Sequence, residues 1–103
     1  GGWHITPRAL VKFSCALQAG KLVGKSVLKE MRKTGLAGSK YGMGVCVNSH
    51  AQWHMGSLAT TRSILVHTSR HGGWSWALVS VSPIDCLDPF GWTCLNVVRN
   101  AKS

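Results

Sequence analysis

A glycine-rich stretch after the first third of the chain limits the folds that this sequence can adopt. Residues 35–44 read GLAGSKYGMG, and their four glycines leave no helical or strand-like apolar period. Glycine loses more backbone freedom in regular structure than other residues, so this stretch predicts a loop. We expect the loop to separate a basic helical part, residues 1–34, from a β-rich part, residues 45–103.

The first part carries the signals of one or two helices. Thr6 can cap a helix whose first position is Pro7, and Gly20 is suited to end it. The apolar positions of this helix share one face, made by Ala9, Leu10, Phe13, Ala16 and Leu17. A second helical run, residues 21–33, has an apolar side made by Leu22 or Val23, Val27, Leu28 and Met31. The sequence leaves open whether Gly20 separates two helices or only weakens one.

The last part reads as short strands. Residues 43–47 suggest a first strand, whereas residues 48–61 are ambiguous and also fit a helix through His50, Trp53 and Leu58. Residues 63–67 and 74–82 predict a hairpin around a turn at residues 71–73. Residues 92–98 suggest one more strand. With its helices first and its strands afterwards, the chain of 103 residues predicts a single α+β domain with a small antiparallel sheet.

The charges of this chain indicate a class of partner. Twelve lysines and arginines face three acidic residues, for a formal net charge of +9. Eight of the basic residues lie within the first forty positions, together with a single acid, Glu30. Such a balance favours polyanions such as nucleic acid or acidic membrane surfaces, and it places the contact in the N-terminal part.

Residues 19–26, AGKLVGKS, fit the loose form of a phosphate-binding loop. A working loop of this kind lies between a buried strand and a helix, so that backbone N–H groups face the phosphates. The preceding residues, 8–18, fit a helix instead, and no alternation of strands and helices follows. We therefore expect no nucleotide site and no cofactor.

A helix that includes these lysines explains their spacing better than a phosphate-binding loop does. Lys21, Lys25 and Lys29 recur at every fourth position and would form one basic stripe. Like charges at this spacing repel one another, which a bound polyanion relieves. An ordinary solvated lysine face is the alternative. The predicted RNA-binding residues are Arg8, Lys12, Lys21, Lys25, Lys29, Arg32, Lys33, Lys40 and Tyr41.

The sequence gives weaker signals for a metal site or a catalytic site. Cys46, His50 and His54 would share a face only on a helix, so we expect no metal site. No nucleophile motif surrounds a serine or cysteine, and the carboxylates of Asp85 and Asp88 suit turns better than catalysis. We therefore predict that the protein is not an enzyme and takes no small-molecule substrate.

Cysteine and tryptophan content leaves alternatives open. The four cysteines, Cys15, Cys46, Cys86 and Cys94, are widely spaced, which favours reduced thiols but permits two disulfides. Trp74 and Trp76 would share one face of a strand, either in the core or as a platform for unpaired bases.

Together these observations predict a structural RNA-binding protein, most simply a subunit of a ribosome or another ribonucleoprotein. No acidic residue precedes Glu30, whereas basic and hydroxyl residues are frequent there. This composition resembles that of organellar targeting segments, so a mitochondrial location is expected beside a cytoplasmic one. No apolar run is long enough to span a membrane. The alternatives are a secreted cationic effector or toxin with disulfides and an accessory subunit of a membrane complex.

Overall fold

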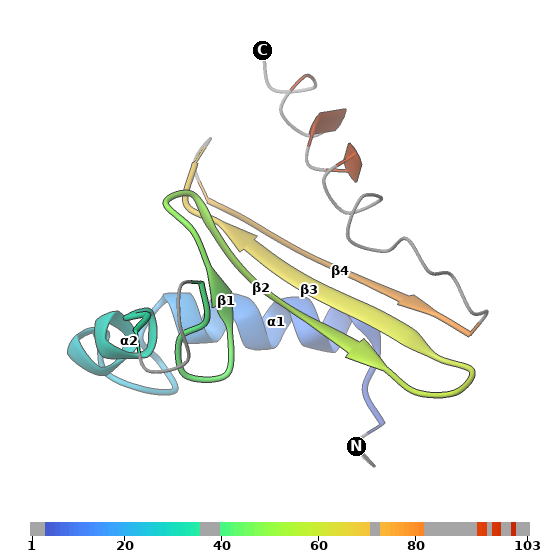
Figure 1. Ribbon diagram of the computed structural model, residues 1–103, viewed down its shortest axis with the longest axis horizontal. Coiled ribbons are helices and arrows are strands. Elements are labelled where there is room, and N and C mark those ends of the chain that lie inside the picture. Colours follow the sequence, from blue (N-terminus) through green and yellow to red (C-terminus); the bar gives the residue numbers. More distant parts are fainter. Residues whose placement is uncertain are drawn as a thin grey trace.

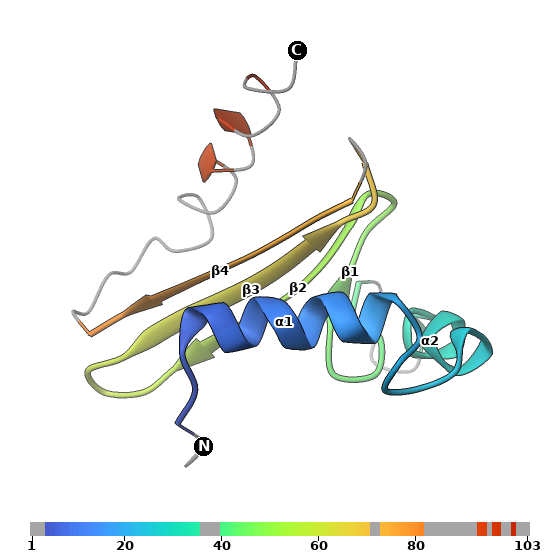
Figure 2. The ribbon, with the colours of Figure 1, turned by 180° about the vertical axis from the view of Figure 1, so that it is seen from behind.

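The chain folds as two helices followed by a four-stranded antiparallel sheet, the α+β arrangement that the sequence predicts (Figure 1). The computed structural model describes residues 4–35, 40–70 and 73–81, together with Thr93, Cys94, Asn96, Val97 and Asn100. The elements are α1 (Pro7–Gln18), α2 (Lys25–Met31), β1 (Cys46–Val47), β2 (Ala51–Ser57), β3 (Arg62–Thr68) and β4 (Trp74–Ser80). The strands lie in the order β1-β2-β3-β4, and α1 runs across one face of the sheet (Figure 2).

Both ends of α1 follow the sequence signals. Thr6 Oγ1 accepts a hydrogen bond of 3.1 Å from the backbone N–H of Ala9, which caps the first turn. At the other end Gly20 has a φ of +75°, and the Lys21 N–H donates to the carbonyl of Ala16. This pattern is the Schellman motif, in which a left-handed glycine closes the last turn. Of the two alternatives that the sequence leaves open, the structure shows that Gly20 separates two helices.

The buried face of α1 is not the fully apolar face that we expected. Ser14 and Leu17 are the buried residues of the helix, whereas the Phe13 side chain is 49% exposed. Ser14 is tolerated there because its hydroxyl lies 3.0 Å from the Ser75 hydroxyl on β4. Hydrophobic periodicity alone could not have anticipated a polar partner on the sheet.

The second helix is shorter than the sequence suggests. It begins at Lys25, so Lys21 lies in the turn before it and not on the helix as expected. Gly24 occupies the N-cap position without a side-chain hydrogen bond, and no residue of α2 is buried. This helix therefore gains little from capping or from packing.

Residues 51–57 form β2, and the helix that these positions also allowed is absent. The Asn48 side-chain oxygen accepts hydrogen bonds of 2.8 Å and 2.7 Å from the N–H groups of His50 and Ala51, which turns the chain between β1 and β2. Of the strand expected over residues 43–47, Cys46 and Val47 pair with β2.

The hairpin of β3 and β4 is confirmed, with Thr68 opposite Trp74 and Arg62 opposite Ser80. The strand expected over residues 92–98 is wrong for the residues described there, because Thr93, Cys94, Asn96 and Val97 have helical backbone. Asp85, Asp88 and Cys86 lie outside the described residues.

The apolar core lies mainly on the sheet face turned away from α1. Ser75 faces α1 and pairs with His67, so the alternating residues Ile64 and Val66 point to the other face. Their side chains are 2% and 4% exposed. Val66 lies between two tryptophans in the register, Trp53 on β2 and Trp76 on β4. The tryptophans therefore flank the buried centre of the sheet.

We expect the replacement Ile64→Val to lower the free energy of unfolding by about 0.5–1.5 kcal/mol, because it removes one buried methylene and leaves a small cavity. The same change at Ile5, which is 50% exposed, provides the matched control and should stay within about 0.5 kcal/mol of the wild type. Urea unfolding followed by far-ultraviolet circular dichroism measures both. Equal effects of the two replacements would contradict this assignment of the core.

Candidate nucleic-acid interface

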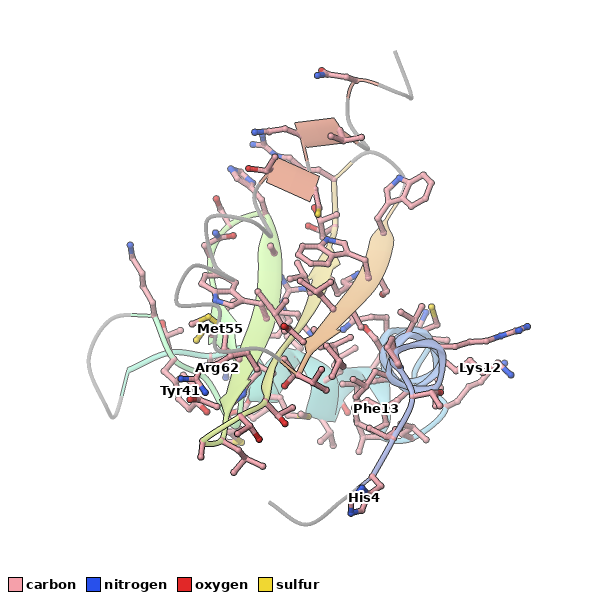
Figure 3. All side chains as sticks on the ribbon, turned by 90° about the vertical axis from the view of Figure 1, so that its right-hand side faces the viewer. His4, Lys12, Phe13, Tyr41, Met55 and Arg62 are labelled. Carbon is pink, nitrogen blue, oxygen red and sulfur yellow. The ribbon has the colours of Figure 1, made fainter. Side chains whose placement is uncertain are left out.

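The predicted cationic residues lie on the helical part of the molecule and on the loop that follows it. Arg8 and Lys12 are exposed on α1, one turn apart, and the Lys12 side chain projects away from the sheet (Figure 3). Tyr41 lies on the opposite side of the molecule in the same view, and α2 lies between. The further predicted cations belong to the turn before α2, to α2, to the segment after it and to the loop, and are Lys21, Lys25, Lys29, Arg32, Lys33 and Lys40.

Most of these cations have no carboxylate partner among the residues that the structure describes. The ion pair found within the described ranges joins Lys33 Nζ to Glu30 Oε2 at 2.8 Å, with both side chains largely exposed. Arg8, Lys12 and the lysines at positions 21, 25 and 29 are exposed without a carboxylate partner in that part of the chain. An exposed ion pair such as Lys33–Glu30 contributes little to stability, so its components remain available to a ligand.

The lysine stripe is interrupted. Lys25 and Lys29 stand one turn apart on α2, whereas Lys21 precedes the helix and follows the Gly20 turn. Close packing accompanies this turn, since a Cβ atom on Gly20 would lie 3.1 Å from Cγ of Lys25. The structure therefore divides the cations into a pair on α1 and a pair on α2, with Lys21 at the junction.

Arg32 differs from the other predicted contacts. It is half-buried at the end of α2, and its charge acts on His67 of β3. Desolvation by burial and, next, the positive charge of Arg32 lower the pKa of His67 below its ordinary value of 6.5. Arg32 is thus less exposed than the other predicted cations, which the sequence did not indicate.

Beneath α1 a line of hydrogen bonds joins the helix to the sheet. His67 Nδ1 lies 2.9 Å from Ser75 Oγ, which in turn lies 3.0 Å from Ser14 Oγ. Sequence reasoning missed this group, although a hairpin centred on residue 71 would have placed His67 opposite Ser75. The line fixes α1, and with it Arg8 and Lys12, relative to the sheet.

The loop before β1 contributes a second group that sequence reasoning missed. The Tyr41 hydroxyl lies 3.0 Å from His54 Nε2, and the two rings meet edge to face with centroids 6.0 Å apart. Tyr41 also bridges to Cys46 through its backbone. This long-range contact between the loop and β2 has no signal in the sequence.

The described part of the chain offers little support for a metal site, a nucleotide site, a pair of disulfides or a membrane span. There, no three histidine, cysteine or acidic side chains lie close enough to hold a metal ion. The stretch 19–26 follows α1 and not a strand, so it lacks the setting of a phosphate-binding loop. Cys15 and Cys94 carry free thiols, whereas two disulfides would require all four cysteines. None of the helices in the described ranges is long and apolar enough to cross a membrane.

No protein-family model, curated protein or solved structure matches this chain. Its function must therefore be argued from its own residues.

We expect the stability of the protein to fall as the pH decreases below about 6.5. Because the pKa of His67 is lower in the folded state than in the unfolded state, the unfolded chain binds more protons in this range. This stability is fully present above the unfolded pKa and is lost as the pH falls toward the folded one. One such group gives a slope of at most about 1.4 kcal/mol per pH unit.

Thermal unfolding between pH 5 and 8 measures this dependence on the wild type and two variants. His67→Gln should remove the contribution of this group, and Arg32→Gln should make it shallower, because one of the two causes of the lowered pKa is gone. A wild-type profile that His67→Gln leaves unchanged would contradict the assignment.

Proposed function

We propose that this protein is a structural RNA-binding subunit of a ribosome or another ribonucleoprotein, in an organelle or in the cytoplasm. The observation that supports the proposal is the set of exposed cations on two consecutive helices, which have no carboxylate partner among the described residues. Its contacts with phosphates would use the cations of α1, α2 and the loop, with Arg32 as a partial contributor. It acts by binding and performs no catalysis.

The energetics of α2 favour a polyanionic partner. Lys25 and Lys29 repel each other on a helix that has no side-chain cap and buries none of its residues. A phosphate between them removes the repulsion and releases counterions, so binding and helix formation stabilise each other. Side chains one turn apart have Cβ atoms about 5–6 Å apart, which lets neighbouring lysines contact the same phosphate or successive ones.

This binding is directed to phosphates and shape more than to base sequence. Lysine and arginine on an exposed helix face contact the backbone, whereas sequence readout requires side chains that reach base edges. A net charge of +9 also accelerates association with RNA at low salt.

The test is the salt dependence of RNA affinity, measured by fluorescence anisotropy with a labelled RNA oligonucleotide. The logarithm of the association constant should fall linearly with the logarithm of the salt concentration. Replacing Lys25 or Lys29 by Gln should reduce the slope by about 0.7 for each lysine that contacts a phosphate of a single strand.

Arg70→Gln is the matched control, because it removes one exposed charge from the turn after β3 and not from the helices. Its slope should stay close to that of the wild type. Equal effects of Arg70→Gln and Lys29→Gln would show that binding follows net charge alone. A wild-type affinity that hardly changes with salt would refute the proposal, and affinity for anionic vesicles without affinity for RNA would replace it with a membrane role.

A further inference from the structure

An open hollow lies between the C-terminal end of α2 and the loop that leads to β1. Its volume is about 380 Å³, within the range of about 300–1,000 Å³ found for small-molecule sites. Its lining includes Glu30 and Lys33 from the helical side and Tyr41, Gly42 and Met43 from the loop. A hollow of this size accommodates a single nucleobase with its ribose.

The loop that forms one wall is fixed to α2. The N–H of Met43 donates to the carbonyl of Met31 at 2.8 Å, and the N–H of Gly42 donates to the carbonyl of Val45 at 2.7 Å. A Cβ atom on Gly42 would lie 2.3 Å from the Met31 carbonyl oxygen, so only glycine permits this approach. The wall is therefore held in place before any ligand binds.

Tyr41 presents an aromatic ring at this hollow. Its hydroxyl contact and edge-to-face contact with His54 hold the ring, while 39% of the residue stays exposed. A held ring loses little conformational entropy when a flat ligand stacks on it. Stacking on aromatic rings is the usual way in which proteins bind unpaired bases.

The charges around the hollow favour a base inside it and phosphates outside. The Glu30 carboxylate on the lining repels a phosphate, but it can accept hydrogen bonds from the amino groups of bases. Lys33 pairs with this carboxylate at 2.8 Å, and Lys40 is exposed next to Tyr41 in the chain. The two ammonium groups attract the phosphates that flank the base.

From these contacts we propose that the hollow beside Tyr41 is a binding site for one unpaired nucleobase of single-stranded RNA, whose backbone continues along the lysines of α2. This site rests on the RNA-binding function proposed above and specifies its substrate as single-stranded. A base inside a duplex cannot reach the ring, because it remains stacked between its neighbours.

The test uses the full chain and a short single-stranded RNA that contains 2-aminopurine, a base whose fluorescence falls when it stacks on an aromatic ring. The wild type should quench this fluorescence and bind the single strand more tightly than a duplex of the same length. Tyr41→Leu should abolish the quenching and lower the single-strand affinity about 5- to 150-fold, with little change for the duplex.

Three variants make the result specific. Tyr41→Phe keeps the ring and should retain the quenching, whereas Phe13→Leu removes another exposed aromatic ring and should behave as the wild type. Gly42→Ala displaces the loop from α2 without changing ring or charge, and it should weaken single-strand binding selectively. Circular dichroism of each variant establishes that it is folded.

Quenching by Tyr41→Leu equal to that of the wild type, or equal affinity of the wild type for single strand and duplex, would overturn this site. In either case salt-dependent RNA binding would still support the proposed function. Absence of binding to both RNAs would refute the function and the site together.

Discussion

The hydrogen-bonded line from Ser14 through Ser75 to His67 holds the two layers of this protein together. It joins α1 to β4 and β3 at a place where an apolar contact would be usual. Hydrogen bonds have directional requirements that apolar contacts lack, so the line sets how α1 lies on the sheet. The cations of α1 take their positions from this junction. The junction also links the helical layer to His67, whose pKa is lowered by burial and by the charge of Arg32.

The two faces of the sheet have different roles. Toward α1 the sheet offers Ser75 and His67, while the other face has Val66 between two tryptophans. A partner on the helical side would add burial where the chain alone provides little, since no residue of α2 is buried. It would do so without disturbing the tryptophans that flank the sheet centre.

The sequence predicted those features of the fold that depend on residues close together in the chain, such as helix caps and turns. Thr6, Pro7 and Gly20 set the bounds of α1, and alternation with a turn set the hairpin of β3 and β4. The predicted start of α2 was wrong, because the chain turns at Gly20 and the new helix begins only after Gly24, whose extended backbone occupies the N-cap position. The strand β2 was ambiguous, since its pattern also fits a helix and pairing with β3 decides between them.

In the candidate interface, too, some features could be predicted from the sequence and others could not. Exposure of the lysines follows from their charge and could be predicted, whereas the effect of Arg32 on His67 depends on the distance between them. Tyr41 was identified as a ring in a loop, but the hollow beside it arises where the loop meets α2. Contacts between residues far apart in the chain have no periodic signal, so a single sequence does not reveal them.

The left-handed turn at Gly20 determines the curvature of the candidate interface. An uninterrupted helix would place its lysines along one straight line parallel to the helix axis. Because the chain reverses its local handedness at Gly20, α2 does not continue the line of α1 (Figures 1 and 2). The cations therefore follow a bent path, which a rigid duplex can meet at few points. A flexible strand can follow the whole path, because its backbone bends at each nucleotide.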